Sequence, residues 1–146
     1  MDITEYFRIV STSGRVLHLE NKGFWSEQVA RQLGGAMLAQ FRKAAKEVSR
    51  EGPFIVLADL RELDVLSRQG KVILSRVMQC AKDYGIYKSV EIVPNAITKL
   101  SIREAAELTG QPNFRVMTGS FDEAITLVET LKQEMLAAES VESSAS

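Results

Sequence analysis

The sequence predicts an α/β fold in which a mixed sheet of about five strands is covered by four helices, in the order ββαβαβαβα. Strand-length β-rich runs alternate with helix-length amphipathic patterns along the chain. A continuous apolar run at 54–60 is typical of a strand covered on both faces. The 146 residues, 45% hydrophobic and 25% charged, suit one soluble domain. We expect that domain over 1–139 and a disordered tail over 140–146.

The first half of the chain predicts a hairpin, a long helix and the central strand. Two β-rich runs in 6–21 flank Ser13–Gly14, a dipeptide that favours a tight turn. Ser26 is a good N-cap for an amphipathic helix that ends near Arg50, because Pro53 disfavours helical backbone before it. Hairpin strands run antiparallel, whereas strands joined by helical crossovers run parallel, so the sheet is expected to be mixed.

Two features of that half concern packing. Phe24 and Trp25 precede the long helix. They could be an exposed anchor for a partner, but burial under the helix start is favoured. Gly34–Gly35 lies inside the same helix, where each glycine costs about 1 kcal/mol relative to alanine. We therefore expect the pair to permit close packing of the helix against the sheet.

The second half predicts two helix–strand pairs followed by a final helix. The expected elements are a helix from Ser67 to about Tyr84, a strand at 88–93, a short helix that begins near Ile97 and stops at Gly110 before Pro112, a strand at 114–118, and a helix from the capping box at Ser120. The short helix contains a second capping-box pattern, Ser101 to Glu104.

The chain carries few groups for catalysis or metal binding. The nine glycines form neither a dinucleotide-binding fingerprint nor a P-loop. Cys80 is the only cysteine and His18 the only histidine, so no disulfide framework or structural zinc set can be assembled, and we expect no metal or cofactor. We expect Cys80 to be buried on a helix, and His18 to lie opposite Leu17 and Leu19 as a structural residue. An enzyme is therefore not expected.

Charge and targeting signals point to a cytoplasmic protein without a nucleic-acid partner. A net charge of −1 lacks the basic surplus of nucleic-acid binders. The N-terminus does not resemble a signal peptide, and the apolar runs are too short to cross a membrane. The basic residues Arg42, Lys43, Lys46 and Arg50 could touch an anionic membrane, but a solvated helix face is favoured because Glu47 and Glu51 interrupt them.

Two acids follow the central strand, where open α/β sheets tend to place functional groups. Asp59 closes the strand and Asp64 lies in the next loop. Two carboxylates could bind Mg²⁺, whereas the alternative is that they accept hydrogen bonds from loop amides before the next helix. The second interpretation is favoured.

The segment Asp59-Leu60-Arg61-Glu62-Leu63-Asp64-Val65-Leu66-Ser67-Arg68-Gln69-Gly70, together with the element order, resembles the STAS and SpoIIAA-like superfamily of bacterial anti-sigma factor antagonists. Asp59-Leu60 matches that family's strand end and Gly70 its glycine. The resemblance extends over about residues 6–136. It implies a STAS-like sandwich and a non-catalytic, regulatory protein-interaction module in bacterial signalling, whose partner is a regulatory or kinase-like protein.

The sequence departs from that family where its members carry the phosphorylated serine. Ser67-Arg68-Gln69 stands at the Asp-Ser-Ser positions, so Ser67 is the only nearby hydroxyl. An N-cap role explains Ser67 and is favoured, although phosphate there would be stabilised by the helix N-terminus and Arg68. The expected partner-binding residues are Asp59, Asp64, Ser67, Arg68 and Gln69, with Ser67 as the candidate phosphorylation site.

A second hypothesis follows from the same resemblance. The SpoIIAA-like branch shares its fold with lipid-carrying Sec14-type domains, which implies binding or sensing of a small apolar ligand, with a membrane-surface role as one form of it. Such a ligand would occupy a pocket between helices and sheet. Homodimerisation through a sheet edge or helix face also remains open.

Overall fold

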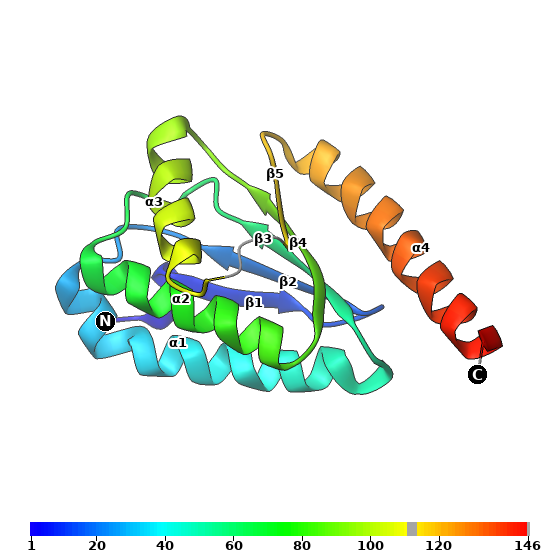
Figure 1. Ribbon diagram of the computed structural model, residues 1–146. Helices are drawn as coiled ribbons and strands as arrows, with labels where there is room; N and C mark the ends of the chain where they lie inside the picture. Colours follow the sequence, from blue (N-terminus) through cyan, green and yellow to red (C-terminus); the bar gives the residue numbers. More distant parts are fainter. Residues whose placement is uncertain (111–113, 146) are drawn as a thin grey trace.

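The computed structural model describes residues 1–110 and 114–145, with side chains described through residue 142 (Figure 1). Its sheet has five strands in the spatial order β1-β2-β3-β4-β5. β1 is antiparallel to β2, and the remaining neighbours are parallel. The strands are β1 Phe7–Ser11, β2 Val16–Asn21, β3 Phe54–Asp59, β4 Ile86–Ile92 and β5 Arg115–Thr118. The expected mixed α/β sheet and element order are confirmed.

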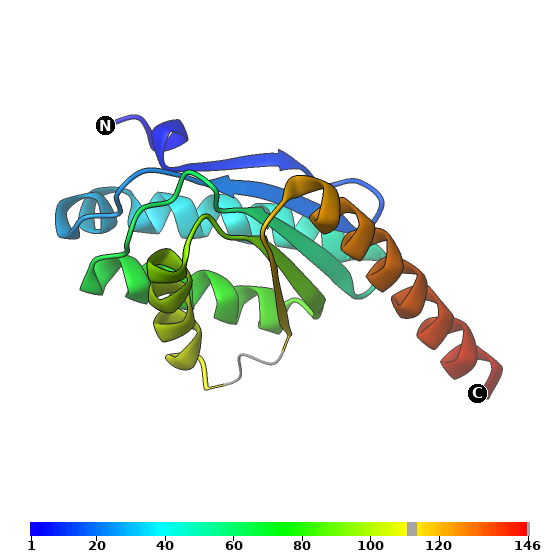
Figure 2. The same ribbon diagram turned by 90° about the horizontal axis from the view of Figure 1, so that it is seen from above.

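Four helices cover this sheet unequally. They are α1 Glu27–Val48, α2 Arg68–Asp83, α3 Ala96–Glu107 and α4 Phe121–Ala145. Figure 1 shows α1, α2 and α3 gathered together and α4 apart from them, and Figure 2 gives the view from above. α1 packs on α2 and α2 on α3, whereas α4 contacts β3, β4 and β5. One face of the sheet therefore carries three helices and the other carries one.

The strand β3 shows how the two faces are made. Phe54, Val56 and Ala58 belong to the hydrophobic cluster under α1–α3, and Ile55 and Leu57 belong to the cluster under α4. All five are at most 7% exposed. Because successive strand residues point to opposite faces, a continuous apolar run is required here. The expectation of a central strand covered on both faces is confirmed.

Helix packing on the three-helix face depends on Gly34. A Cβ at this position would lie 2.5 Å from Ile73 Cδ1 on α2, whereas a Cβ at Gly35 would meet nothing within 4 Å. The prediction that the glycine pair serves contact with the sheet is therefore wrong. Gly34 permits close approach of α1 to α2, and Gly35 has open space around its Cα.

The two aromatic residues before α1 also differ. Trp25 is fully buried and its indole Nε1 donates to the Lys22 carbonyl oxygen at 3.1 Å. Phe24 is 50% exposed, so its expected burial is wrong. Of the two, Trp25 alone is buried, and its backbone carbonyl also contacts the start of α2, as described below.

The last helix is longer than the sequence indicates. α4 continues to Ala145, although a disordered tail is predicted from residue 140. Arg15 in the β1–β2 turn contributes to its anchoring: the guanidinium Nη1 donates to Glu139 Oε2 at 2.7 Å and a second nitrogen donates to Oε1. The same guanidinium binds the Pro53 carbonyl oxygen at 2.7 Å. This link spans distant parts of the sequence, so local patterns do not reveal it.

The short third helix begins and ends close to the expected positions. Asn95 is its N-cap, and the Asn95 side chain accepts a hydrogen bond from the Thr98 amide at 2.8 Å. The pattern at Ser101 is not a cap, because Ser101 lies within α3 and its hydroxyl accepts the Leu66 amide at 2.9 Å. Gly110 follows the helix with φ of +73°. Pro112 lies outside the described residues.

Candidate functional site

Asp59, at the end of β3, is paired within its own loop. Arg61 donates to both carboxylate oxygens, with Nε to Oδ1 at 2.9 Å and Nη2 to Oδ2 at 2.7 Å. The Arg61 amide also approaches Oδ1 at 3.2 Å. The Arg61 guanidinium therefore holds the pKa of Asp59 below its ordinary value. Arg61 lies over the Phe121 ring of α4 at 5.3 Å, which places this pair on the α4 side of the sheet.

Asp64 has a different local partner. Its Oδ1 accepts the Val65 amide at 2.7 Å, and its own amide donates to the Gly23 carbonyl oxygen at 3.0 Å. Both acids therefore accept loop amides, the interpretation favoured from sequence. Among the described residues, no group of three or more His, Cys, Asp or Glu side chains could hold a metal ion.

Ser67 caps α2 and joins it to the segment before α1. Its hydroxyl accepts the Gly70 amide at 3.0 Å and donates to the Trp25 carbonyl oxygen at 2.6 Å. A Cβ at Gly70 would lie 2.7 Å from that same carbonyl oxygen, so the position requires glycine. The N-cap role expected for Ser67 is observed, and Gly70 is needed because the backbone at Trp25 passes so close.

Arg68 and Gln69 follow Ser67 and are exposed. Asp64 is also exposed, and Val65 is 38% exposed. Phe24 belongs to the same region, because Gly23 pairs with Leu63 and the Trp25 carbonyl oxygen receives the Ser67 hydroxyl. We name Phe24, Asp64, Val65, Arg68 and Gln69 the α2-start surface. Of the five predicted site residues, it unites Asp64, Arg68 and Gln69 around the half-buried cap at Ser67.

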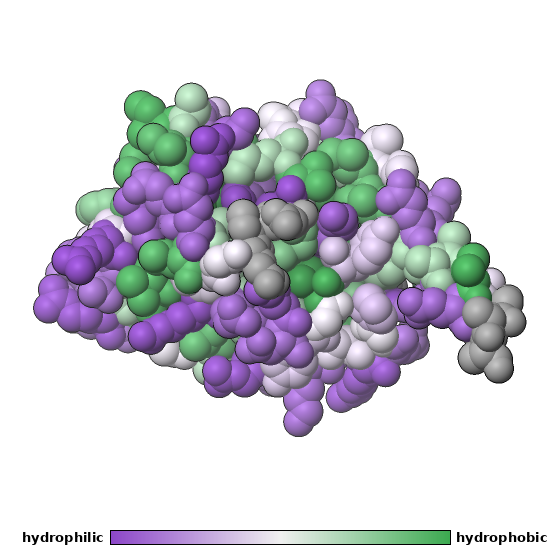
Figure 3. Space-filling view, in the orientation of Figure 1, coloured by the Kyte–Doolittle hydropathy of each residue, from purple (hydrophilic) through white to green (hydrophobic). Residues whose placement is uncertain are grey.

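The apolar character of this region extends to the beginning of α3. Ile97 is 68% exposed and Leu100 is 53% exposed. Figure 3 shows hydrophobic residues at the upper left of the molecule, where α3 begins in Figure 1. The hydrogen bond between the Leu66 amide and Ser101 holds this end of α3 beside the loop before α2.

Asp59 belongs instead to a charged group on the α4 side. Glu20 pairs with Arg8 across β1 and β2, and Asp59 pairs with Arg61. Glu20, Lys22, Asp59, Arg61 and Glu62 line an open surface hollow of about 420 Å³. It holds three acidic and two basic residues, and the acids Glu20 and Asp59 are already paired. The structure therefore separates Asp59 from the other predicted site residues.

His18 lies on the same side as this charged group. Its ring centroid is 6.0 Å from that of Phe121, and its Nε2 has no hydrogen-bond partner among the described residues. Burial lowers the pKa of His18, while the carboxylates of Asp59 and Glu20 act in the opposite direction. Cys80 is buried on α2 as expected, and burial raises the pKa of its thiol. A raised pKa leaves the Cys80 thiol protonated and therefore weakly nucleophilic at neutral pH.

Sequence reasoning missed a group of buried polar side chains on the three-helix face. Glu91 on β4 and Arg115 on β5 form an ion pair whose side chains are 4% and 6% exposed. Arg115 donates through Nη2 at 2.6 Å and Nε at 2.9 Å. Asn21 at the end of β2 is 3% exposed. The available signal was Glu91 between two apolar residues of a strand, since a buried carboxylate needs a partner.

No protein-family model matches the chain, and no curated protein is similar enough to count as a relative. In the described part of the chain, no helix is both long and apolar enough to cross a membrane.

Proposed function

We propose that this protein is a non-catalytic, STAS-like regulatory module that binds a protein partner through the α2-start surface. The single observation that carries the proposal is the exposed Phe24 on a segment whose neighbouring backbone is fixed to the start of α2. An aromatic side chain and an arginine on a rigid support are typical of residues that dominate binding energy. Phe24 and Arg68 provide that combination here.

The contacts beneath the surface support its rigidity. Trp25 is fully buried, and its carbonyl oxygen receives both the hydroxyl and the amide of Ser67. Because these groups hold the backbone on both sides, partner binding would require little ordering of the chain. We propose a partner that offers an apolar pocket to Phe24 and a carboxylate to Arg68.

Ser67 is the position in this surface at which modification would have a structural effect. A phosphate on its Oγ would remove the proton that the hydroxyl donates to the Trp25 carbonyl oxygen, and would add negative charge beside Arg68. A kinase would therefore have to open the start of α2. We propose that phosphorylation, where it occurs, alters the α2-start surface through this cap.

The test uses a photoreactive amino acid placed at Gln69 in the full chain, in cells of its own source. The expected result is a crosslink to a defined protein, which is then purified for affinity measurements. Phe24→Ser and Arg68→Glu should each weaken binding about ten-fold or more, as hot-spot residues do. Arg76→Glu is the matched control, because Arg76 is an exposed arginine two turns further along α2.

The comparison of these variants decides the assignment. Arg76→Glu should bind like the unmodified chain, and all three variants should keep the unmodified thermal unfolding midpoint within a few degrees. Unchanged affinity in both Phe24→Ser and Arg68→Glu would rule out the α2-start surface. Equal weakening by Arg76→Glu would show a general charge effect instead of a site.

A further inference from the structure

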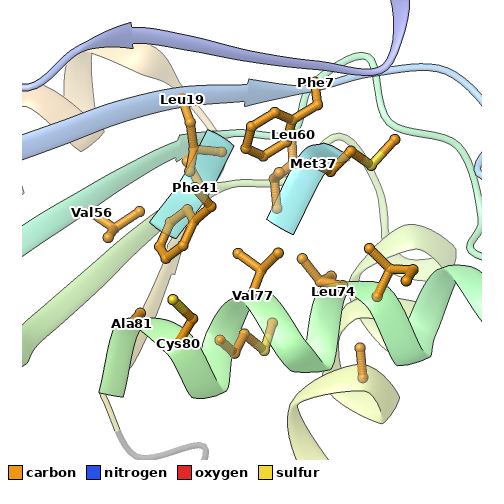
Figure 4. Close-up of a cluster of buried hydrophobic side chains, with 14 of the residues drawn as sticks. Phe7, Leu19, Met37, Phe41, Val56, Leu60, Leu74, Val77, Cys80 and Ala81 are labelled. Atoms are coloured by element: carbon orange, nitrogen blue, oxygen red, sulfur yellow. The ribbon is translucent and has the colours of Figure 1, made fainter. Parts of the chain in front are cut away.

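A narrow pocket of about 40 Å³ lies between the sheet and helices α1, α2 and α3. Figure 4 shows several of its walls, with Val77 and Leu74 of α2 facing Phe41 of α1 and Leu19 and Val56 of the sheet. Met78, Ile102 and Phe114 also line it. The walls are therefore mainly apolar side chains from all three helices.

The sheet side of the pocket carries polar side chains beside its apolar ones. Asn21, Ser89 and Glu91, from the strands β2 and β4, line it there. Asn21 is 3% exposed, and its Oδ1 has no hydrogen-bond partner among the described residues. An amide oxygen that is buried without a donor costs about 1–3 kcal/mol. A donor inside the pocket would remove that cost.

The ion pair of Glu91 limits the charge of a ligand that carries this donor. The charge of Glu91 is matched by Arg115 through two hydrogen bonds, at 2.6 and 2.9 Å. A charged ligand would therefore enter an apolar space without an unpaired counter-charge, which is strongly unfavourable. The ligand should be neutral.

Volume restricts the ligand further. One water needs about 10–15 Å³ of such space, so a pocket of about 40 Å³ admits a molecule of a few heavy atoms. An acyl chain would have to displace side chains of the core, which favours a much smaller ligand than a lipid. Met78 lines one wall, and methionine adapts its shape readily.

We infer that this pocket binds a small neutral molecule of the alcohol class, whose hydroxyl donates to Asn21 Oδ1 and whose carbons contact Val77 and Met78. The inference is independent of the protein partner proposed above, because the two sites use different residues. A negative result for one site would therefore not affect the proposal for the other.

Ethanol is the probe, titrated into the full chain labelled with ¹³C at valine and methionine methyl groups. The Val77 and Met78 signals should shift and then saturate, whereas methyl signals outside the pocket should stay nearly constant. Asn21→Leu removes the acceptor and keeps a similar volume. It should weaken ethanol binding about five- to ten-fold, the loss expected for one hydrogen bond.

A second probe distinguishes the pocket from general solvent effects. Xenon has no hydrogen to donate and should bind Asn21→Leu more tightly than the unmodified chain. Shifts that rise linearly without saturation would overturn the inference, as would ethanol affinities that are equal in the unmodified chain and Asn21→Leu.

Discussion

The two faces of the sheet differ in how far their ion pairs are exposed to solvent. Under α1–α3, Glu91 and Arg115 are paired with side chains 4% and 6% exposed. On the α4 side, the Asp59–Arg61 pair has side chains 13% and 50% exposed. Three helices exclude water from the first pair, whereas the single helix α4 leaves the second near solvent. A pair of a carboxylate and an arginine therefore has different energetic consequences on the two faces, depending on how many helices cover it.

The largest expected effect tests the buried pair. Arg115→Met leaves the Glu91 carboxylate in the core without its partner, and we expect the free energy of unfolding to fall by about 3–5 kcal/mol. Urea denaturation at neutral pH measures it. The double variant Glu91→Leu/Arg115→Met should recover most of the loss, because it removes both charges. A single-variant loss below about 1 kcal/mol, the range of exposed pairs, would contradict the difference between the faces.

The next effect compares two sides of one helix within the three-helix face. In Gly34→Ala the new methyl group would lie 2.5 Å from Ile73 Cδ1, and overpacking should outweigh the better helix propensity by about 1–2 kcal/mol. In Gly35→Ala nothing lies within 4 Å, so stability should rise by about 0.5–1 kcal/mol. Thermal unfolding of both variants gives the signs. Equal shifts in one direction would show that Ile73 does not limit the approach of α1 to α2.

The sequence was sufficient to predict the helices and strands and their order, because hydrophobic periodicity and capping residues are local signals. It was also sufficient for the cap at Ser67 and the burial of Cys80. It was insufficient where two distant segments meet: Gly34 against Ile73, Arg15 against Glu139, and Gly70 against the Trp25 backbone. The split of Asp59 from Asp64 and Arg68 has a different, local origin, because Arg61 turns back onto Asp59 only two residues earlier at the end of β3.

A smaller effect is expected for the exposed pair. Arg61→Met should lower the free energy of unfolding by about 1 kcal/mol or less. Since Arg61 holds the pKa of Asp59 below its ordinary value, the stabilisation is present above about pH 4. It is lost as the pH falls through the folded-state pKa. The difference between the unmodified chain and Arg61→Met should therefore shrink between pH 7 and pH 3 in urea denaturation. A constant difference over that range would point to lost contact with Phe121 as the cause.

The smallest expected effect on stability comes from His18, which is partly buried on the α4 side near four charged residues. Burial lowers its pKa, and the groups acting on it are the acids Asp59 and Glu20 and the bases Arg8 and Arg61. With a lowered folded-state pKa, the unfolded chain takes up the proton first, so stability should decline as the pH falls below about 6.5. His18 is the only histidine, and it is the side-chain type whose ordinary pKa lies between pH 7.5 and pH 5. His18→Gln should flatten the decline in urea midpoint over that range. If the decline persists in His18→Gln, its cause is the titration of carboxylates. Burial on the α4 side would then not disfavour the charged form of His18.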